Sequence, residues 1–492
     1  MPIRGFDKIR IGGMSALRPF LLLKNSIVAI DGFWFVKRYI LKNDYTRVLS
    51  HGVENICENV IRAFCEQINK NNVQVLWIWD GIKINKDYYQ QIDAEGSYAE
   101  GCMHYFNKDK YKASFSWRKW LDMEQFVLSA NKLLSTFSDN VTVIRAPYTA
   151  MAQMVYFYKM KACDYIYGPN DLLLFENTGK IITEFDFLGN LDVDGKNKCN
   201  TYNIELTYKD EILKAYKLEF TAFKNYGFLL GCEFCPTFPE YATNFNIQEI
   251  FYISRLTFPE LKERLNIYYN NDAGAILTET YIENYKRAQT LVRNQPIISM
   301  EGKLQFLHLA LTNTGIVWNE QSEKKFEYLF GLRLPNACYE KLFIMKIIPD
   351  VLEILNKKDY KISNLPEIKE LCENIKQYFM KGDIKRANDV LYKCIGETNI
   401  KDIMNIFFNF LKKRNILNEK ELGILSQAIT YKKDKNNFID KEMTKEYLLF
   451  IGKISPWIKY FNLLISFNNL LNEENIEFIS FDYSIFRMII EK

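Results

Sequence analysis

The first half of the chain alternates short apolar runs with turns that contain glycine or proline. Ile27–Ile30 runs into Asp31-Gly32 and Val73–Trp79 runs into Asp80-Gly81, whereas Val53–Lys70 between them carries apolar residues at helical spacing. This pattern predicts two buried strands joined by a helix. Because the strand ends of an open parallel sheet gather along one edge, we expect Asp31 and Asp80 to lie near each other.

A second strand–helix–strand unit follows further along the chain. Its first apolar run, Val141–Ile144, ends before Pro147, which disfavours helical backbone at the preceding residue. Thr149 is a suitable N-cap for the helix that comes next. Another apolar run, Tyr165–Tyr167, stops at Gly168-Pro169, and the roughly twenty residues between the runs leave room for a helical crossover. The pattern predicts two parallel strands of one sheet.

The periodicity changes near residue 246. Lys180–Phe187 and Tyr202–Tyr208 are expected to form a hairpin across a polar turn at 189–200, and a polar stretch then leads to Asn246. From Ile247 onward the pattern is almost entirely helical, including a short helix at Leu304–Thr312, and prolines at 259, 349 and 456 are expected to interrupt the longer helices. We therefore predict an α/β domain with a mostly parallel sheet at 1–245, a helical middle region at 246–356 and a helical C-terminal domain at 357–492.

Composition limits the partners and the compartment. The 492 residues carry a formal net charge of only +4, so any nucleic-acid contact must come from a local patch or through a partner. Most of the ten cysteines sit in apolar runs, as is typical of reduced, buried thiols. Cys232 and Cys235 form a C-x-x-C pair without a nearby histidine or second pair, which argues against zinc. No apolar run approaches the ~18 residues of a membrane span, so we expect a cytoplasmic protein without membrane contact.

An insertion at 82–120 has no clear period and mixes basic with aromatic residues. Such mixtures can hold phosphates and stack bases. The candidates for RNA contact are Lys108, Lys110, Lys112, Trp117, Arg118 and Lys119. Acidic residues dilute this charge, and Trp117 and Trp120 would share a helix face, which is common in packing. A partly buried arch or lid is the alternative interpretation. The basic cluster Lys412-Lys413-Arg414 is interpreted as a solvated helix end.

Several segments, taken in order, resemble the XPG and flap-endonuclease nucleases, whose core is a PIN-like α/β domain. Met1-Pro2-Ile3-Arg4-Gly5-Phe6 is similar to the N-terminal motif of these nucleases, with Pro2 in place of a glycine. The internal motifs are matched by Ile30-Asp31, Trp79-Asp80-Gly81, Ala146-Pro147 and Leu230-Gly231-Cys232-Glu233-Phe234-Cys235-Pro236-Thr237. The resemblance implies a PIN-like domain at 1–245, in which 82–120 is the arch.

Active members of this superfamily hold two divalent ions with a set of acidic side chains. Carried over one at a time, these positions fall on Asp31, Asp80, Thr149, Met151, Pro169, Asp171 and Glu233. Thr149, Met151 and Pro169 lack a carboxylate, so the resemblance implies no catalytic residues and no cofactor. Asp31, Asp80, Asp171 and Glu233 are the vestigial candidates for residual magnesium. Alternatively, Asp31 and Asp80 end their strands by accepting turn hydrogen bonds.

One branch of the superfamily fits the loss of acidic residues at these positions. It is the MKT (maintenance of killer toxin) family of post-transcriptional regulators. Ala146-Pro147-Tyr148-Thr149 and Tyr165-Ile166-Tyr167-Gly168-Pro169-Asn170-Asp171 resemble this family more closely than any active nuclease. The resemblance implies a non-catalytic scaffold that regulates mRNA translation or stability in the cytoplasm. The implied partners are an ataxin-2-like protein that binds poly(A)-binding protein, contacted through the C-terminal region, and mRNA ribonucleoprotein. An active metal-dependent, structure-specific nuclease and a factor docked on the ribosome or another large assembly are the alternatives.

Overall fold

The computed structural model describes residues 3–9, 14–84, 94–187, 202–270, 272–312, 320–356, 366–395, 403–430, 442–473 and 475–491. The predicted turn at 189–200 and the motif residues Met1-Pro2 lie outside these ranges. The chain divides into two compact units: unit 1 comprises residues 1–35, 66–81 and 140–330, and unit 2 comprises residues 36–65, 82–139 and 331–492. These borders cut across the predicted ranges 1–245, 246–356 and 357–492. The insertion at 82–120 belongs to the same unit as residues 331–492.

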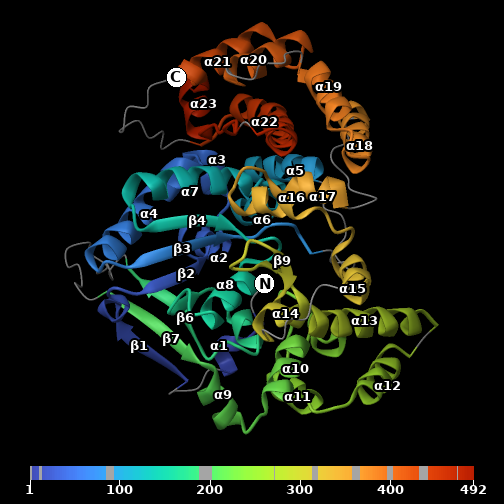
Figure 1. The fold of residues 1–492 in the computed structure, drawn as a ribbon. Helices are drawn as coiled ribbons and strands as arrows, with labels where there is room; N and C mark the ends of the chain where they lie inside the picture. Colours follow the sequence, from blue (N-terminus) through green and yellow to red (C-terminus); the bar gives the residue numbers. More distant parts are fainter. Residues whose placement is uncertain are drawn as a thin grey trace. The chain divides into compact units, whose positions relative to one another are not determined.

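Unit 1 is built on a seven-stranded sheet with the strand order β1-β7-β6-β5-β2-β3-β4 (Figure 1). The strands are β1 (Ser15–Pro19), β2 (Ile27–Asp31), β3 (Gln74–Trp79), β4 (Val141–Arg145), β5 (Tyr165–Tyr167), β6 (Lys180–Asp186) and β7 (Asn203–Tyr208). The five strands from β6 to β4 in this order pair in parallel, and β7 pairs antiparallel with both β6 and β1. The predicted mostly parallel sheet and the β6–β7 hairpin are confirmed.

The central strands form because their side chains are buried. Val28, Ala29 and Ile30 of β2 and Trp77 of β3 are almost completely buried, as expected for parallel strands in the middle of a sheet. Helix α8 (Ala150–Lys159) connects β4 to β5 and contacts β2, β3 and β5. Its residues from 150 to 157 are all buried, which explains why the helix is apolar on nearly every side.

The remaining elements of unit 1 are helical, apart from a small antiparallel hairpin of β8 (Pro296–Ile298) and β9 (Leu304–Phe306). The predicted helix at Leu304–Thr312 is therefore wrong at its start, because the first three residues pair with β8 and only Leu307–Thr312 is helical. The helices and 3-10 turns are α1 (Phe6–Ile9), η1 (Phe20–Leu23), α2 (Gly32–Phe35), η3 (Asn170–Leu174), α9 (Lys209–Tyr216), α10 (Phe220–Leu230), η4 (Pro239–Tyr241), α11 (Ile247–Ile253), α12 (Phe258–Tyr269), α13 (Asp272–Asn294), α14 (Leu307–Thr312) and α15 (Glu320–Phe330).

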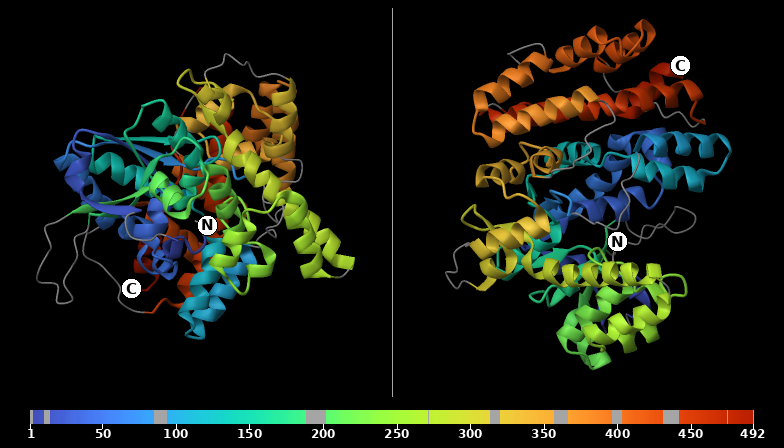
Figure 2. Two further views of the ribbon diagram at one scale, coloured as in Figure 1. Left: turned by 90° about the horizontal axis from the view of Figure 1, so that it is seen from below. Right: turned by 90° about the vertical axis from the view of Figure 1, so that its right-hand side faces the viewer.

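Unit 2 is helical in its described residues, and α4 runs from it into unit 1. Its elements are the π-helix η2 (Val36–Leu41), α3 (Thr46–His51), α4 (Val53–Lys70), α5 (Ala94–Phe106), α6 (Lys110–Trp120), α7 (Glu124–Phe137), α16 (Asn336–Phe343), α17 (Pro349–Asn356), α18 (Pro366–Met380), α19 (Ile384–Ile395), α20 (Ile403–Lys413), α21 (Glu419–Thr430), α22 (Lys445–Leu471) and α23 (Tyr483–Ile490). The predicted mainly helical C-terminal region is confirmed. Helices α5 and α6 lie side by side as a hairpin (Figure 1 and Figure 2).

Prolines act differently in the three long helical patterns. Pro259 lies in the first turn of α12 and Pro349 begins α17, so both interrupt the pattern as predicted. The predicted break at Pro456 is wrong, because α22 continues through it. Ile454 and Ile458 on either side are buried, so tertiary packing outweighs the loss of one backbone hydrogen bond. By length and composition alone α22 could cross a membrane, but 61% of its apolar window is buried inside the structure, as in a core helix.

Candidate functional site

Asp31 and Asp80 follow neighbouring parallel strands at one edge of the sheet. The register of β2 and β3 places Asp31 beside Ile78, two residues before Asp80. Asp31 is 5% exposed, and its Oδ1 accepts a hydrogen bond of 2.9 Å from the Trp34 N–H in the first turn of α2. The Asp31 carboxylate therefore holds the turn that ends its strand, which is the structural role proposed for it as the alternative to metal binding.

The Asp80 carboxylate caps α8. Its Oδ1 accepts a hydrogen bond of 2.7 Å from the N–H of Ala150, the first residue of the helix. Thr149 is the N-cap, as predicted, and its Oγ1 accepts from the Ala152 N–H at 3.3 Å. The first N–H groups of a helix have no partner within the helix and favour negative charge, so Asp80 and Thr149 together stabilise the start of α8.

One face of α8 is also bonded to a segment far away in the sequence. Gln153 is fully buried; its Nε2 donates to the Ile298 carbonyl oxygen and its Oε1 accepts from the Ile298 N–H, both at 2.9 Å. The Thr149 hydroxyl donates to the side-chain oxygen of Gln295, which is also fully buried. We call the following set of contacts the α8 seam: Thr149 with Gln295, Gln153 with Ile298, and the Tyr156 hydroxyl with the Met300 N–H at 3.0 Å.

Aromatic packing continues this cover at the beginning of α8. The Tyr148 ring centroid lies 4.7 Å from that of Phe330 and 6.2 Å from that of Phe326. Met151 is buried beside the N-cap Thr149. The start of α8 therefore carries a helix-capping hydroxyl at Thr149 and a buried thioether at Met151.

Asp171 and Glu233 meet on the other side of the β5 strand end. Asp171 is completely buried in η3, which follows the buried Pro169, and its Oδ2 accepts a hydrogen bond of 2.9 Å from the Glu233 N–H. Burial raises the pKa of the Asp171 carboxyl from 3.8 to about 7, whereas the hydrogen bond from the Glu233 N–H lowers it. The Glu233 side chain is partly exposed. The contact between these residues uses the Glu233 backbone.

Asp31, Asp80, Asp171 and Glu233 are the four acidic candidates for a metal centre. In the described parts of the chain, no group of three or more His, Cys, Asp or Glu side chains is arranged to hold an ion. Two-ion chemistry requires several carboxylates that converge on a pair of cations. Asp31, Asp80 and Asp171 each accept a backbone N–H group through one carboxylate oxygen.

The basic candidates belong to unit 2, in the α5–α6 hairpin. Lys108, Lys110, Lys112, Arg118 and Lys119 are all exposed. Lys108 forms an ion pair with Glu442 at 2.5 Å, and Lys112 forms one with Asp109 at 3.1 Å. Trp117 is only 1% exposed, so it cannot stack on a base. The prediction of Trp117 as an RNA contact is therefore wrong. Its indole packs against Gly101, where an added Cβ would lie 2.4 Å from the ring.

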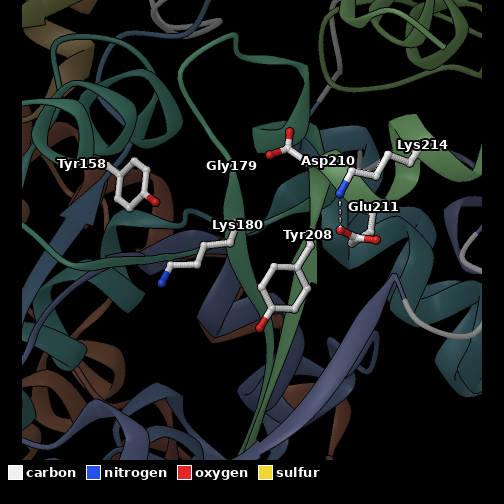
Figure 3. Close-up of a pocket in the computed structure, with 7 residues that line it drawn as sticks. All are labelled: Tyr158, Gly179, Lys180, Tyr208, Asp210, Glu211 and Lys214. Atoms are coloured by element: carbon white, nitrogen blue, oxygen red, sulfur yellow. Dashed lines mark hydrogen bonds and ion pairs between the residues drawn. The ribbon is translucent and has the colours of Figure 1, made fainter. Parts of the chain in front are cut away.

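Two cavities of unit 1 are lined by residues other than the predicted site residues. One, of about 310 Å³, is lined by Tyr158, Gly179, Lys180, Tyr208, Asp210, Glu211 and Lys214 (Figure 3). The charges there are mixed, and Lys214 is paired with Glu211 at 2.9 Å. Another, of about 420 Å³, is lined by Glu240, Leu256, Glu260, Glu263, Arg264, Ile267 and Tyr268. Neither cavity adds a reactive group to the strand-end carboxylates.

Known proteins resemble this chain at two levels. No family model matches it. Solved nuclease structures resemble its fold: the catalytic core of Rad2 in complex with DNA substrate (15% identity, 68% of this chain and 96% of that chain, TM-score 0.38), flap endonuclease-1 from Methanococcus jannaschii (15%, 56% and 96%, TM-score 0.32) and human GEN1 in complex with Holliday junction DNA (13%, 73% and 81%, TM-score 0.37).

Sequence comparison gives a more specific relative. The chain is 23% identical over 357 residues to the post-transcriptional regulator mkt1 of Schizosaccharomyces pombe, a match that spans 64% of this chain and 43% of that protein. The chain thus matches less than half the length of this relative. The predicted resemblance to the MKT regulators, which rested on Ala146-Pro147-Tyr148-Thr149 and Tyr165–Asp171, is confirmed.

Proposed function

We propose that this protein is a non-catalytic scaffold with a nuclease fold that acts in post-transcriptional regulation of mRNA through protein partners. The regulatory role follows the sequence similarity to a post-transcriptional regulator. The observation that carries the non-catalytic role is the α8 seam, which occupies one side of the helix that brings two glutamates to the metal centre in the related nucleases. A structural role for Asp80 and Thr149 replaces a catalytic one.

The energetics of the α8 seam favour a permanently closed arrangement. Gln153 and Gln295 are both fully buried, and separating them from their partners would leave the Gln153 amide and the Gln295 side-chain oxygen without hydrogen bonds. Each buried polar group left unsatisfied costs about 1–3 kcal/mol. If the seam opened to admit a hydrated cation or a scissile phosphate, several buried polar groups would lose their hydrogen bonds together. The free-energy cost would be the sum of these penalties.

We further propose that the partner is an ataxin-2-like protein that binds poly(A)-binding protein, and that the complex works in the cytoplasm on mRNA ribonucleoprotein. The helices from residue 247 onward supply exposed surface for such a contact. Exposed apolar side chains there include Tyr252, Ile267, Met380 and Leu449. The ataxin-2-like identity of the partner comes from the family resemblance.

Two assays on the full chain test this function. In the first, purified protein with magnesium or manganese is incubated with flap DNA and with structured RNA, and no cleavage above that of Asp80→Ala is expected. Cleavage that disappears in Asp80→Ala would establish the active nuclease instead. In the second, the protein is tethered to a reporter mRNA in cells, where translation or half-life is expected to change equally for wild type and Asp80→Asn. Co-purification with ribosomal proteins in place of an ataxin-2-like partner would favour docking on the ribosome.

A further inference from the structure

We propose that the outer face of α6 binds single-stranded RNA, with Tyr111 and Phe115 stacking on bases and Arg118 and Lys119 contacting phosphates. The inference that the strand bound in the cell is RNA rests on the proposed function. The binding chemistry itself rests on the structure of the α5–α6 hairpin. The four side chains follow the spacing i, i+4, i+7 and i+8, so they share one face of the helix.

These side chains are displayed to solvent. Tyr111 is 83% and Phe115 is 53% exposed, and Arg118 and Lys119 are also exposed. Along the helix axis the two aromatic positions are separated by about 6 Å, since each residue rises about 1.5 Å. Isolated exposed aromatic residues are common on proteins, but an adjacent pair flanked on both sides by cations is the arrangement of a stacking platform for a nucleic-acid strand.

The opposite face of α6 holds this platform rigidly within unit 2. Trp117 lies buried against Gly101 of α5. Ser114 Oγ accepts a hydrogen bond of 2.9 Å from the Tyr45 N–H. The Tyr98 hydroxyl of α5 donates to the Leu448 carbonyl oxygen of α22 at 2.6 Å, which ties the hairpin to the core helix of the unit. Because the backbone is already fixed, little ordering of the hairpin opposes binding.

The charges of α6 select an anionic partner. The helix carries four basic and no acidic residues in Lys110–Trp120. Lys119 Nζ lies 4.9 Å from the Phe115 ring centroid, so a cation already accompanies one stacking surface. Lys112 is paired with Asp109, whereas neither Arg118 nor Lys119 has an ion pair with any carboxylate in the described ranges. A nucleic-acid strand offers phosphates to the cations and planar bases to the aromatic rings. An apolar peptide offers no negative charge to the cations.

Fluorescence anisotropy of the full chain tests the stacking residues. The probes are labelled oligoadenylate and oligouridylate of about 12 nucleotides, a length within the usual footprint of single-strand binders. We expect saturable binding to both, weakened at least about tenfold by the double substitution Tyr111→Ala, Phe115→Ala. The matched control is Tyr328→Ala, which removes an equally exposed tyrosine of α15 and should leave the affinity unchanged.

The salt dependence tests the cations separately. Each phosphate contact contributes about 0.7 to the slope of log K against log salt for a single strand, so Arg118→Gln, Lys119→Gln should flatten the slope by roughly 1.4. The Tyr111→Ala, Phe115→Ala variant should keep the wild-type slope. The charge control is Lys412→Gln, Lys413→Gln at the exposed end of α20, which should leave the slope as it is.

Several results would overturn the proposal. The first is the absence of saturable binding at about 150 mM salt. The second is an equal loss of RNA affinity for the α6 variants and their controls, and the third is a preference for a duplex of the same sequence. A Tyr111→Ala, Phe115→Ala protein that keeps its RNA affinity but loses its protein partner would show that the face docks a protein instead. Equal affinity for DNA and RNA single strands supports the proposal, because stacking and phosphate contact do not require the 2′-hydroxyl. The tethered reporter supplies RNA attachment artificially, so it can succeed even if the α6 face does not bind RNA.

Discussion

The α8 seam makes a quantitative prediction for Gln153→Leu. The Gln153 side chain is fully buried and satisfies both the N–H and the carbonyl oxygen of Ile298, at 2.9 Å each. Leucine has nearly the same volume and preserves packing against the neighbouring apolar residues of α8. The substitution therefore isolates the polar part of the contact between the helix and the β8–β9 hairpin.

The expected loss of stability follows from the two backbone groups left without a partner. Each lost hydrogen bond has a net worth of about 1 kcal/mol, and each buried group left unsatisfied costs about 1–3 kcal/mol. The apolar leucine side chain recovers a part of this cost on burial. We expect the free energy of unfolding of unit 1 to fall by about 2–4 kcal/mol, with faster amide hydrogen exchange confined at first to residues 295–306.

Urea unfolding monitored by tryptophan fluorescence, together with hydrogen exchange, measures this effect. Trp77 and Trp79 in β3 report on unit 1. The control is Gln74→Leu, because the Gln74 amide bonds Asn140 at an exposed position and its loss should change stability by less than about 0.5 kcal/mol. A Gln153→Leu protein within about 0.5 kcal/mol of wild type, with unchanged exchange in the hairpin, would refute the importance of the seam.

Three further substitutions test individual contacts. The pKa of the Asp171 carboxyl is raised from 3.8 to about 7, so between these pH values the folded state holds a proton that the unfolded state has lost. The free energy of unfolding should therefore fall by up to roughly 4 kcal/mol as the pH rises from 4 to 7. Urea unfolding of Asp171→Asn should lack this slope, and parallel pH profiles of the two proteins would contradict the assignment. Thr149→Val removes the N-cap hydroxyl and its bond to Gln295 and should cost about 1–2 kcal/mol by thermal unfolding, with Thr149→Ser restoring most of it; equal effects of the two changes would argue against capping. A Cβ at Gly81 would lie 2.1 Å from the Ala146 carbonyl oxygen, so Gly81→Ala should destabilise the fold by more than about 2 kcal/mol in the same urea titration. The control is Gly179→Ala, which has no atom within 4 Å of its Cβ and should be close to neutral. Comparable losses for both variants would be inconsistent with this packing.

The parallel strands β2, β3, β4 and β5 could be predicted because they are short apolar runs that end in clear turn signals, whereas β1 (Ser15–Pro19) was missed because it has no such pattern. Asp31-Gly32, Asp80-Gly81 and Gly168-Pro169 mark three strand ends, and each signal is local in the sequence. The N-cap Thr149 could be predicted for the same reason. The partners of α8 could not, because Gln295 and Ile298 lie more than a hundred residues away. The single available signal was Gln153, a polar residue inside an otherwise apolar helix.

The segment 82–120 was predicted to be an arch or lid, but its helices α5 and α6 could not be found from apolar periodicity. Small and polar residues, Ala113, Ser114 and Ser116, face the interior of unit 2, whereas Tyr111 and Phe115 face solvent. Apolar periodicity is weak in such a helix, because small and polar residues share the buried face with Trp117 while two aromatic residues are exposed. The sequence therefore did not distinguish the buried Trp117 from the exposed Tyr111 and Phe115 as base-stacking candidates. In α22, burial on both sides of Pro456 similarly overrode a local rule.

Thermal unfolding with and without divalent cations tests whether the strand-end carboxylates hold turns and caps in place of metal ions. A ligand that binds only the folded state raises the unfolding temperature. We expect a shift below about 1 °C in millimolar magnesium or manganese, equal in wild type and in the Asp31→Asn, Asp80→Asn variant. A rise of several degrees that is lost in that variant would show that a functional metal site has survived.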